Sequence, residues 1–211
     1  DEESKKFWSP TWKPVCADLE SYECHHGFGY TRFLTKSFGI ESELLMFVPP
    51  SDPLEVWELK VTNRSNQRRT LSLWSYLEWC CGESPDSHRE FHKTFLETKC
   101  DREKKAIFAS ERIWTIVNSK GQHWNRSWEY VAFHACNETL KDLSGDKDSF
   151  IGRYHGFQNP EALQTGNYVG KTTGKWDDSI GSLQNSIVLE PGESKTIVWT
   201  LGATTTQSEA N

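Results

Sequence analysis

The chain has 211 residues and carries 24 Lys and Arg against 30 Asp and Glu, a formal net charge of −6 at pH 7. This balance excludes nucleic-acid binding that is driven by bulk positive charge. No apolar run approaches the roughly 20 residues that a membrane-spanning helix needs. Aromatic residues reach 13%, including 10 Trp, which excludes a wholly disordered chain. At this length we expect a single domain over residues 1–211.

Strand patterns dominate the first third of the chain. Through residues 40–48 apolar side chains alternate with glutamates, until Pro49 and Pro50 end the strand by removing backbone donors. In residues 55–63 the apolar side chains again fall on every second position, with a two-residue period that predicts a strand with one buried face.

Two polar turns predict antiparallel hairpins. Residues 63–69 are polar and separate the strand at 55–63 from a second alternating stretch at 71–79, so we expect these two strands to pair. Near the C-terminus, Ile187 and Leu189 lead into a Glu-Pro-Gly-Glu turn at 190–193, and alternation resumes through Leu201. This pattern predicts a second hairpin.

The middle of the chain carries two further strand patterns, at residues 106–117 and 128–136. Residues 137–181 are rich in Gly, Asp, Asn and Thr, which predicts long loops with one short strand. No stretch of 12 or more residues has a convincing 3.6-residue period. The predicted fold class is therefore all-β, a large antiparallel sandwich.

Two cysteine motifs invite a metal or redox interpretation, and neither has the usual spacing. Cys24-His25-His26 offers good zinc ligands, yet consecutive strand residues point to opposite faces and no second Cys/His pair lies nearby. Cys80 and Cys81 are neighbours, which strains a disulfide between them. We expect no metal, and the absence of a C-x-x-C spacing favours reduced thiols in the cytoplasm.

The residues that could bind a sugar or phosphate lie in one loop and on several tryptophans. Within residues 87–93, Arg89 could donate two hydrogen bonds to a phosphate or a sugar diol, or could belong to a solvated rim. Three tryptophans could form platforms for pyranose rings, or could be core residues: Trp124, Trp128 and Trp176.

Signatures of nucleophilic, phosphoryl-transfer and dinucleotide chemistry are absent, since the sequence has no G-x-S-x-G, no P-loop and no G-x-G-x-x-G. Carboxylates are numerous, but no pattern singles out the pair that a glycosidase requires. The sequence predicts no catalytic residue and no cofactor within this chain.

Several motifs nevertheless resemble those of one enzyme family. The run at residues 7–15 (FWSPTWKPV) and the following YECHHGFGYT at 22–31 resemble the N-terminal β domain of the inverting disaccharide phosphorylases of glycoside hydrolase family 94. Stretches at residues 47–49, 55–63, 71–80, 148–154 and 189–194 agree in the same order. The resemblance covers nearly the whole chain and extends to the cyclic β-1,2-glucan synthases.

The resemblance implies a β supersandwich of the galactose mutarotase-like type, truncated at its N-terminal strands, as part of a multidomain enzyme. In the family this domain joins through a helical linker to an (α/α)₆ barrel that holds the catalytic Asp. That Asp protonates the glycosidic oxygen while inorganic phosphate, the co-substrate, attacks the anomeric carbon. The implied partners are a β-linked gluco-oligosaccharide, the catalytic barrel of the same chain and a second copy in a homodimer.

The resemblance also implies a role for one loop. In the family a Gln-Arg pair reaches toward the sugar and phosphate site, and His88-Arg89 stands at the corresponding place here. Arg89 thus matches, whereas His88 departs from the pattern and points to a substrate other than cellobiose. His25 departs from a common Arg, while His26 and Gly27 agree.

Two other functions compete with a noncatalytic phosphorylase domain. A freestanding carbohydrate-binding module would bind glycans through exposed tryptophans. A purely structural interface domain would contribute nothing through Arg89, so removing that side chain would leave turnover unchanged.

Overall fold

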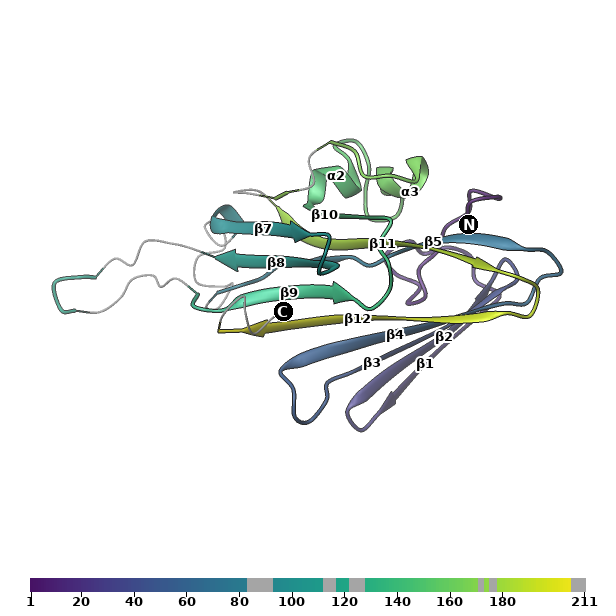
Figure 1. Ribbon diagram of the computed structural model, residues 1–211, viewed down its shortest axis with the longest axis horizontal. Coiled ribbons are helices and arrows are strands. Elements are labelled where there is room, and N and C mark those ends of the chain that lie inside the picture. The colour runs from purple at the N-terminus through teal and green to yellow at the C-terminus, as the bar shows by residue number, and fades with distance from the viewer. Residues whose placement is uncertain (83–92, 112–116, 122–127, 171–172, 175–177, 206–211) are drawn as a thin grey trace.

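A computed structural model describes residues 1–82, 93–111, 117–121, 128–170, 173–174 and 178–205. Its strands form two antiparallel sheets (Figure 1). The larger has eight strands in the order β1-β2-β3-β4-β12-β9-β8-β7. Their bounds are β1 Ser21–Gly27, β2 Tyr30–Ser37, β3 Ile40–Phe47, β4 Leu54–Asn63, β7 Leu96–Asp101, β8 Ala106–Glu111, β9 Val131–Cys136 and β12 Ser194–Thr204.

The smaller sheet has the order β10-β11-β5, and β6 also pairs with β11. These strands are β5 Arg69–Trp74, β6 Leu77–Glu78, β10 Asp142–Asp146 and β11 Ser179–Leu189. Two five-residue helices, α2 Lys147–Ile151 and α3 Glu161–Thr165, lie beside this sheet, and the 3₁₀ turn η1 Lys93–Phe95 precedes β7 (Figure 1). No helix in the described ranges has the length and hydropathy of a membrane span.

Alternation along the strands explains the core between the sheets. The large sheet contributes Leu59, Ile107 and Ile197, and the small sheet contributes Leu143 and Leu183, each at most 5% exposed. A second apolar cluster joins α2, α3 and β11, so the helices cover the outer face of the small sheet. The all-β class and the supersandwich predicted from the sequence are confirmed.

The two predicted hairpins are wrong. β4 pairs with β3 and β12 in the large sheet, whereas β5 pairs with β11 in the small one. β11 and β12 likewise belong to different sheets. The polar turns at 63–69 and 190–193 therefore cross from one layer to the other, because alternation fixes which face of a strand is buried but not which strand lies beside it.

Two predicted elements differ in detail. The stretch at 71–79 is interrupted after Trp74, where Ser75 turns to form hydrogen bonds with His134 and with the backbone of Leu183. Residues 137–181 contain the short strand β10, as expected, and also α2 and α3, which are too short to show a helical period.

Candidate functional site

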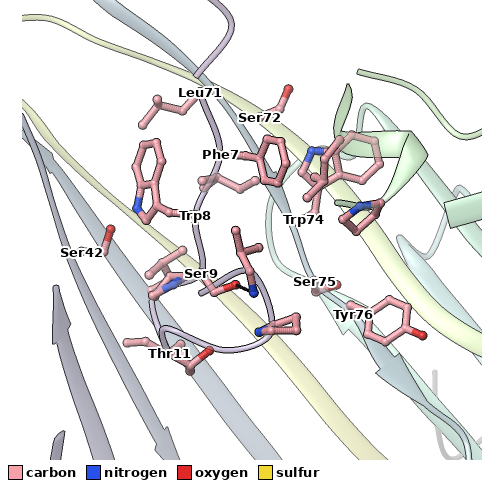
Figure 2. A pocket seen from close by; sticks show the side chains of 18 of the residues that line it. Phe7, Trp8, Ser9, Thr11, Ser42, Leu71, Ser72, Trp74, Ser75 and Tyr76 are labelled. Carbon is pink, nitrogen blue, oxygen red and sulfur yellow. Dashed lines mark hydrogen bonds between the residues drawn. The ribbon is translucent and has the colours of Figure 1, made fainter. Parts of the chain in front are cut away.

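A cavity of about 320 Å³ lies between the two sheets, beneath the N-terminal segment (Figure 2). Phe7 and Trp8 come from that segment, Trp57 and Trp199 from the large sheet, and Trp74 from β5. Trp8 packs against Phe38 with ring centroids 5.4 Å apart. The cavity is lined mainly by aromatic and aliphatic side chains, a composition typical of ligand pockets.

Most hydroxyl groups on the cavity wall already have partners. Ser9 Oγ accepts a hydrogen bond from the Val15 N–H at 3.3 Å, and Thr11 Oγ1 donates to the Lys13 carbonyl at 2.6 Å. Ser72 Oγ donates to the Glu2 carboxylate. Because these groups are engaged, the cavity suits an apolar group better than a sugar ring, which requires many hydrogen bonds.

One polar atom of the lining is an exception. Trp199 is 4% exposed, and its Nε1 has no hydrogen-bond partner among the described residues. The neighbouring Trp57 Nε1 donates to Glu55 at 2.6 Å. A buried donor without a partner is costly, so an acceptor placed against Trp199 would stabilise this region.

Ser75, which lines the cavity, forms a buried pair with His134. Ser75 Oγ is 2.7 Å from His134 Nε2, and His134 Nδ1 is 3.0 Å from the Thr200 carbonyl. The carbonyl can only accept, so Nδ1 carries the proton and Nε2 accepts from the serine. Burial lowers the pKa of His134 to about 4, so the imidazole is neutral at pH 7.

This pair joins the two sheets rather than forming a nucleophilic centre. His134 belongs to β9 of the large sheet, whereas Ser75 also accepts from the Leu183 N–H of the small sheet at 3.1 Å. His134 is completely buried and Ser75 is 5% exposed. A catalytic serine must reach its substrate, and this one is held in a network between layers.

The described lining of the cavity also contains little that could act as a general acid or base. Asp1 is the only acidic residue among its described lining residues, and its carboxylate forms an ion pair with Arg69. Arg69 Nη1 also donates to the Phe38 carbonyl at 2.9 Å. The described lining therefore offers no pair of carboxylates that could act across a glycosidic bond.

Most residues predicted to bind the substrate lie outside the described residues: His88, Arg89, Trp124 and Trp176. Trp128 is described, and it is partly buried against the main core with its ring 5.5 Å from that of Tyr130. The roles of all five residues remain predictions.

The Cys24-His25-His26 motif lies on β1. Cys24 Sγ is 3.5 Å from His26 Nε2, while His25 points to the other face and contacts Glu23 at 3.0 Å. In the described part of the chain, no three His, Cys, Asp or Glu side chains gather as a metal site would require. None of the six cysteines, all of which lie in the described ranges, forms a disulfide.

Sequence reasoning missed the cavity. The sequence feature that could have indicated it is the Trp74-Ser75-Tyr76 triplet. There, aromatic residues on either side of a serine interrupt the apolar alternation of the strand. For Phe7 and Trp8 the sequence indicates only that they belong to a family motif. Which side chains meet across a gap depends on the pairing of the layers, and the sequence alone did not reveal that pairing.

Comparison with known proteins identifies the family of the chain. Residues 1–211 match the family model described as glycosyl hydrolase 94, supersandwich domain. The chain is 27% identical to solabiose phosphorylase of Paenibacillus borealis over 93% of its length, and 26% identical to N,N'-diacetylchitobiose phosphorylase of Vibrio furnissii over 96%. It spans 24%, about a quarter, of each of these relatives.

Other similarities are weaker. The chain is 25% identical to the cyclic beta-(1,2)-glucan synthase of Rhizobium meliloti over 86% of its length, which is 6% of that protein. Among solved structures, a putative aldose 1-epimerase from Escherichia coli superposes with a TM-score of 0.45 at 10% identity, covering 87% of this chain and 68% of that one. Because the family model matches every residue, the chain belongs to the glycosyl hydrolase 94 supersandwich-domain family.

Proposed function

We propose that this chain is the noncatalytic N-terminal domain of an inverting β-glucoside phosphorylase, where it shapes the substrate entrance and contributes to a homodimer contact. The match to the supersandwich family over all 211 residues carries the proposal. The names of the relatives support it, since they are phosphorylases of solabiose and N,N'-diacetylchitobiose. The partner domain would be the (α/α)₆ barrel, and the substrates a β-linked gluco-oligosaccharide and inorganic phosphate.

The chemistry of the described residues agrees with a noncatalytic role. The one acid among the described lining residues is paired with Arg69, and the Ser75 hydroxyl is held between His134 and the Leu183 N–H. We place the protein in the cytoplasm, where six cysteines outside disulfides would stay reduced.

The test compares this chain with the enzyme that contains it. The 211-residue chain alone, shown to be folded by circular dichroism, should release no sugar 1-phosphate from β-glucosides and phosphate. Sugar 1-phosphate production by the chain alone, at a rate that survives purification to homogeneity, would overturn the noncatalytic assignment.

Arg89 provides the second test. In the enzyme that contains the domain, Arg89→Ala should lower kcat/KM for phosphorolysis about a hundredfold, because a lost charged hydrogen bond costs a few kcal/mol. Arg68→Ala, which removes an exposed arginine from the turn after β4, is the matched control and should leave kcat/KM unchanged. Equal rates for the Arg89 variant and the wild type would favour the purely structural interface domain.

The carbohydrate-binding module predicts a different result, measurable affinity for glycans by the chain alone. Of the tryptophans that the structure describes, only Trp12 is exposed, with 43% of its surface accessible. Calorimetric titration with cello-oligosaccharides and β-1,2- and β-1,3-glucans distinguishes the two functions. We expect no saturable heat from the chain alone.

A further inference from the structure

The free edge of β1 differs from the edges at β5 and β7. β1 is the outermost strand of the large sheet, and six of its seven residues are exposed. It contains neither lysine nor proline, and its register against β2 is continuous from Ser21 to Gly27. Natural sheets normally protect such an edge with these residues, with a bulge or with a covering segment.

The turn at the end of β1 determines which peptide groups face outward. Gly27 pairs with Tyr30 across a two-residue turn, so this pair exchanges both hydrogen bonds. Because hydrogen-bonded and non-hydrogen-bonded pairs alternate, the N–H and C=O groups of Tyr22, Cys24 and His26 point away from β2. Within the described ranges, no donor or acceptor meets these groups.

Two other edges are covered, at least in part. At β5, the Glu2 N–H donates to the Thr70 carbonyl at 2.9 Å. At β7, the Thr98 N–H donates to the Gly174 carbonyl at 2.8 Å. Among the described residues β1 is therefore an open edge, with a regular row of donors and acceptors that face solvent.

The sequence of β1 is complementary to itself in one antiparallel register. A two-fold axis at Cys24 pairs all seven residues of the strand, since Ser21 then faces Gly27 of the second copy and Tyr22 faces its His26. Glu23 of each copy faces His25 of the other copy, so two such pairs form on one face of the sheet. An axis at Glu23 would instead oppose two like charges, which is unfavourable.

We propose that the protein forms a dimer through antiparallel pairing of β1 with β1 of a second copy, with the two-fold axis at Cys24. This inference rests on the homodimer in the proposed function and assigns its surface. The pairing joins the two large sheets into one and uses both open edges, so the assembly closes as a dimer instead of growing into a fibre.

Cys24 itself reports the register. Residues opposite each other in a hydrogen-bonded antiparallel pair have Cα atoms about 5.5 Å apart, which a disulfide can bridge. In a Cys80→Ser background, which removes the other exposed thiol, mild oxidation of the purified protein should link Cys24 to Cys24 of the second copy. Mass spectrometry of the linked peptide identifies the pair.

A matched pair of variants tests the register further. With Cys24→Ser added to this background, Tyr22→Cys should not crosslink to itself. Mixed with the corresponding His26→Cys protein, it should form a heterodimeric link, because Tyr22 faces His26 across the axis.

A charge substitution tests the interface without crosslinking. His25→Glu places a carboxylate opposite Glu23 of the second copy at two places, and sedimentation velocity should show the dissociation constant rising tenfold or more. The double variant Glu23→Lys with His25→Glu restores opposite charges and should recover the dimer. Gln158→Glu adds the same charge at an exposed position in the loop before α3 and should have no effect.

The outcomes separate this inference from the proposed function. A dimer with a Cys24 link that His25→Glu weakens supports the β1 interface. A dimer that forms no Cys24 link, and whose dissociation constant is the same in the charge variants, overturns the β1 interface. The proposed homodimer would then use another surface. A monomer at every concentration overturns both, while the phosphorolysis tests of the enzymatic role remain independent.

Discussion

His134 shows how a single buried side chain makes this domain sensitive to pH. It is completely buried on the inner face of the large sheet, and both ring nitrogens have partners. Protonation of Nε2 would replace an accepted hydrogen bond with a donor facing the Ser75 hydroxyl, and would place a charge in the core. Burial therefore lowers the pKa of His134 from the ordinary 6.5 to about 4.

This shift predicts that acid destabilises the domain. Between pH 6.5 and pH 4 the unfolded chain binds a proton at His134 that the folded chain excludes, so stability rises with pH across this window. The His134 contribution is fully present above about pH 6.5 and is lost as the pH falls through about 4. A shift of this size corresponds to about 3 kcal/mol.

Urea unfolding at pH 7, 5.5 and 4.5 measures the effect. His134→Gln removes the titrating group, and the free energy of unfolding of this variant should fall less steeply with acid than that of the wild type. His155→Gln removes an imidazole from the loop before α3 and is the matched control. Identical slopes for the wild type and His134→Gln would show that the pH dependence arises elsewhere.

At the scale of elements, the two turns that cross between the sheets are joined to each other by Asn63. Its backbone N–H donates to the Glu193 carbonyl at 2.9 Å, and its carbonyl accepts from the Gly192 N–H at 2.8 Å. Its side-chain Nδ2 donates to the carbonyls of Leu189 and Gln67. Asn63 is completely buried, so these hydrogen bonds are shielded from water.

Asn63→Ala should destabilise the domain by roughly 2–3 kcal/mol, because the buried Leu189 carbonyl would lose its side-chain donor. Asn66→Ala removes an exposed asparagine from the same turn and should change stability by less than about 0.5 kcal/mol. The midpoint of chemical unfolding, measured for both variants, checks the prediction. A cost for Asn63→Ala no larger than that for Asn66→Ala would contradict this role.

Strand positions were predictable from the sequence, whereas strand partners were not. The stretches at 40–48 and 55–63 match β3 and β4 to within one residue at each end, because alternation depends only on one face being buried. The pairing of β4 with β12 joins segments that lie far apart in the sequence, and a polar turn has the same composition whether it closes a hairpin or crosses between layers. The side chains that meet at the cavity depend on this pairing and were missed for the same reason.

For the whole molecule, the main core cluster predicts a single cooperative unfolding transition. Its buried members come from both sheets, including Ile107 and Ile197 of the large sheet and Leu183 of the small one. A sheet cannot separate from the other without exposing this shared apolar surface. Tryptophan fluorescence, which reports mainly the core, and far-UV circular dichroism, which reports the strands, should therefore give the same midpoint.

Leu183→Ala tests whether the two sheets act as one unit. Leu183 is completely buried on β11, and its truncation should cost roughly 2–5 kcal/mol and lower both midpoints together. Val188→Ala, at a position of the same strand that is 40% exposed, is the matched control and should shift the midpoints little. If Leu183→Ala instead separates the two transitions, the sheets are independent units. The Ser75–His134 contact, which this variant keeps, would then be too weak to couple them.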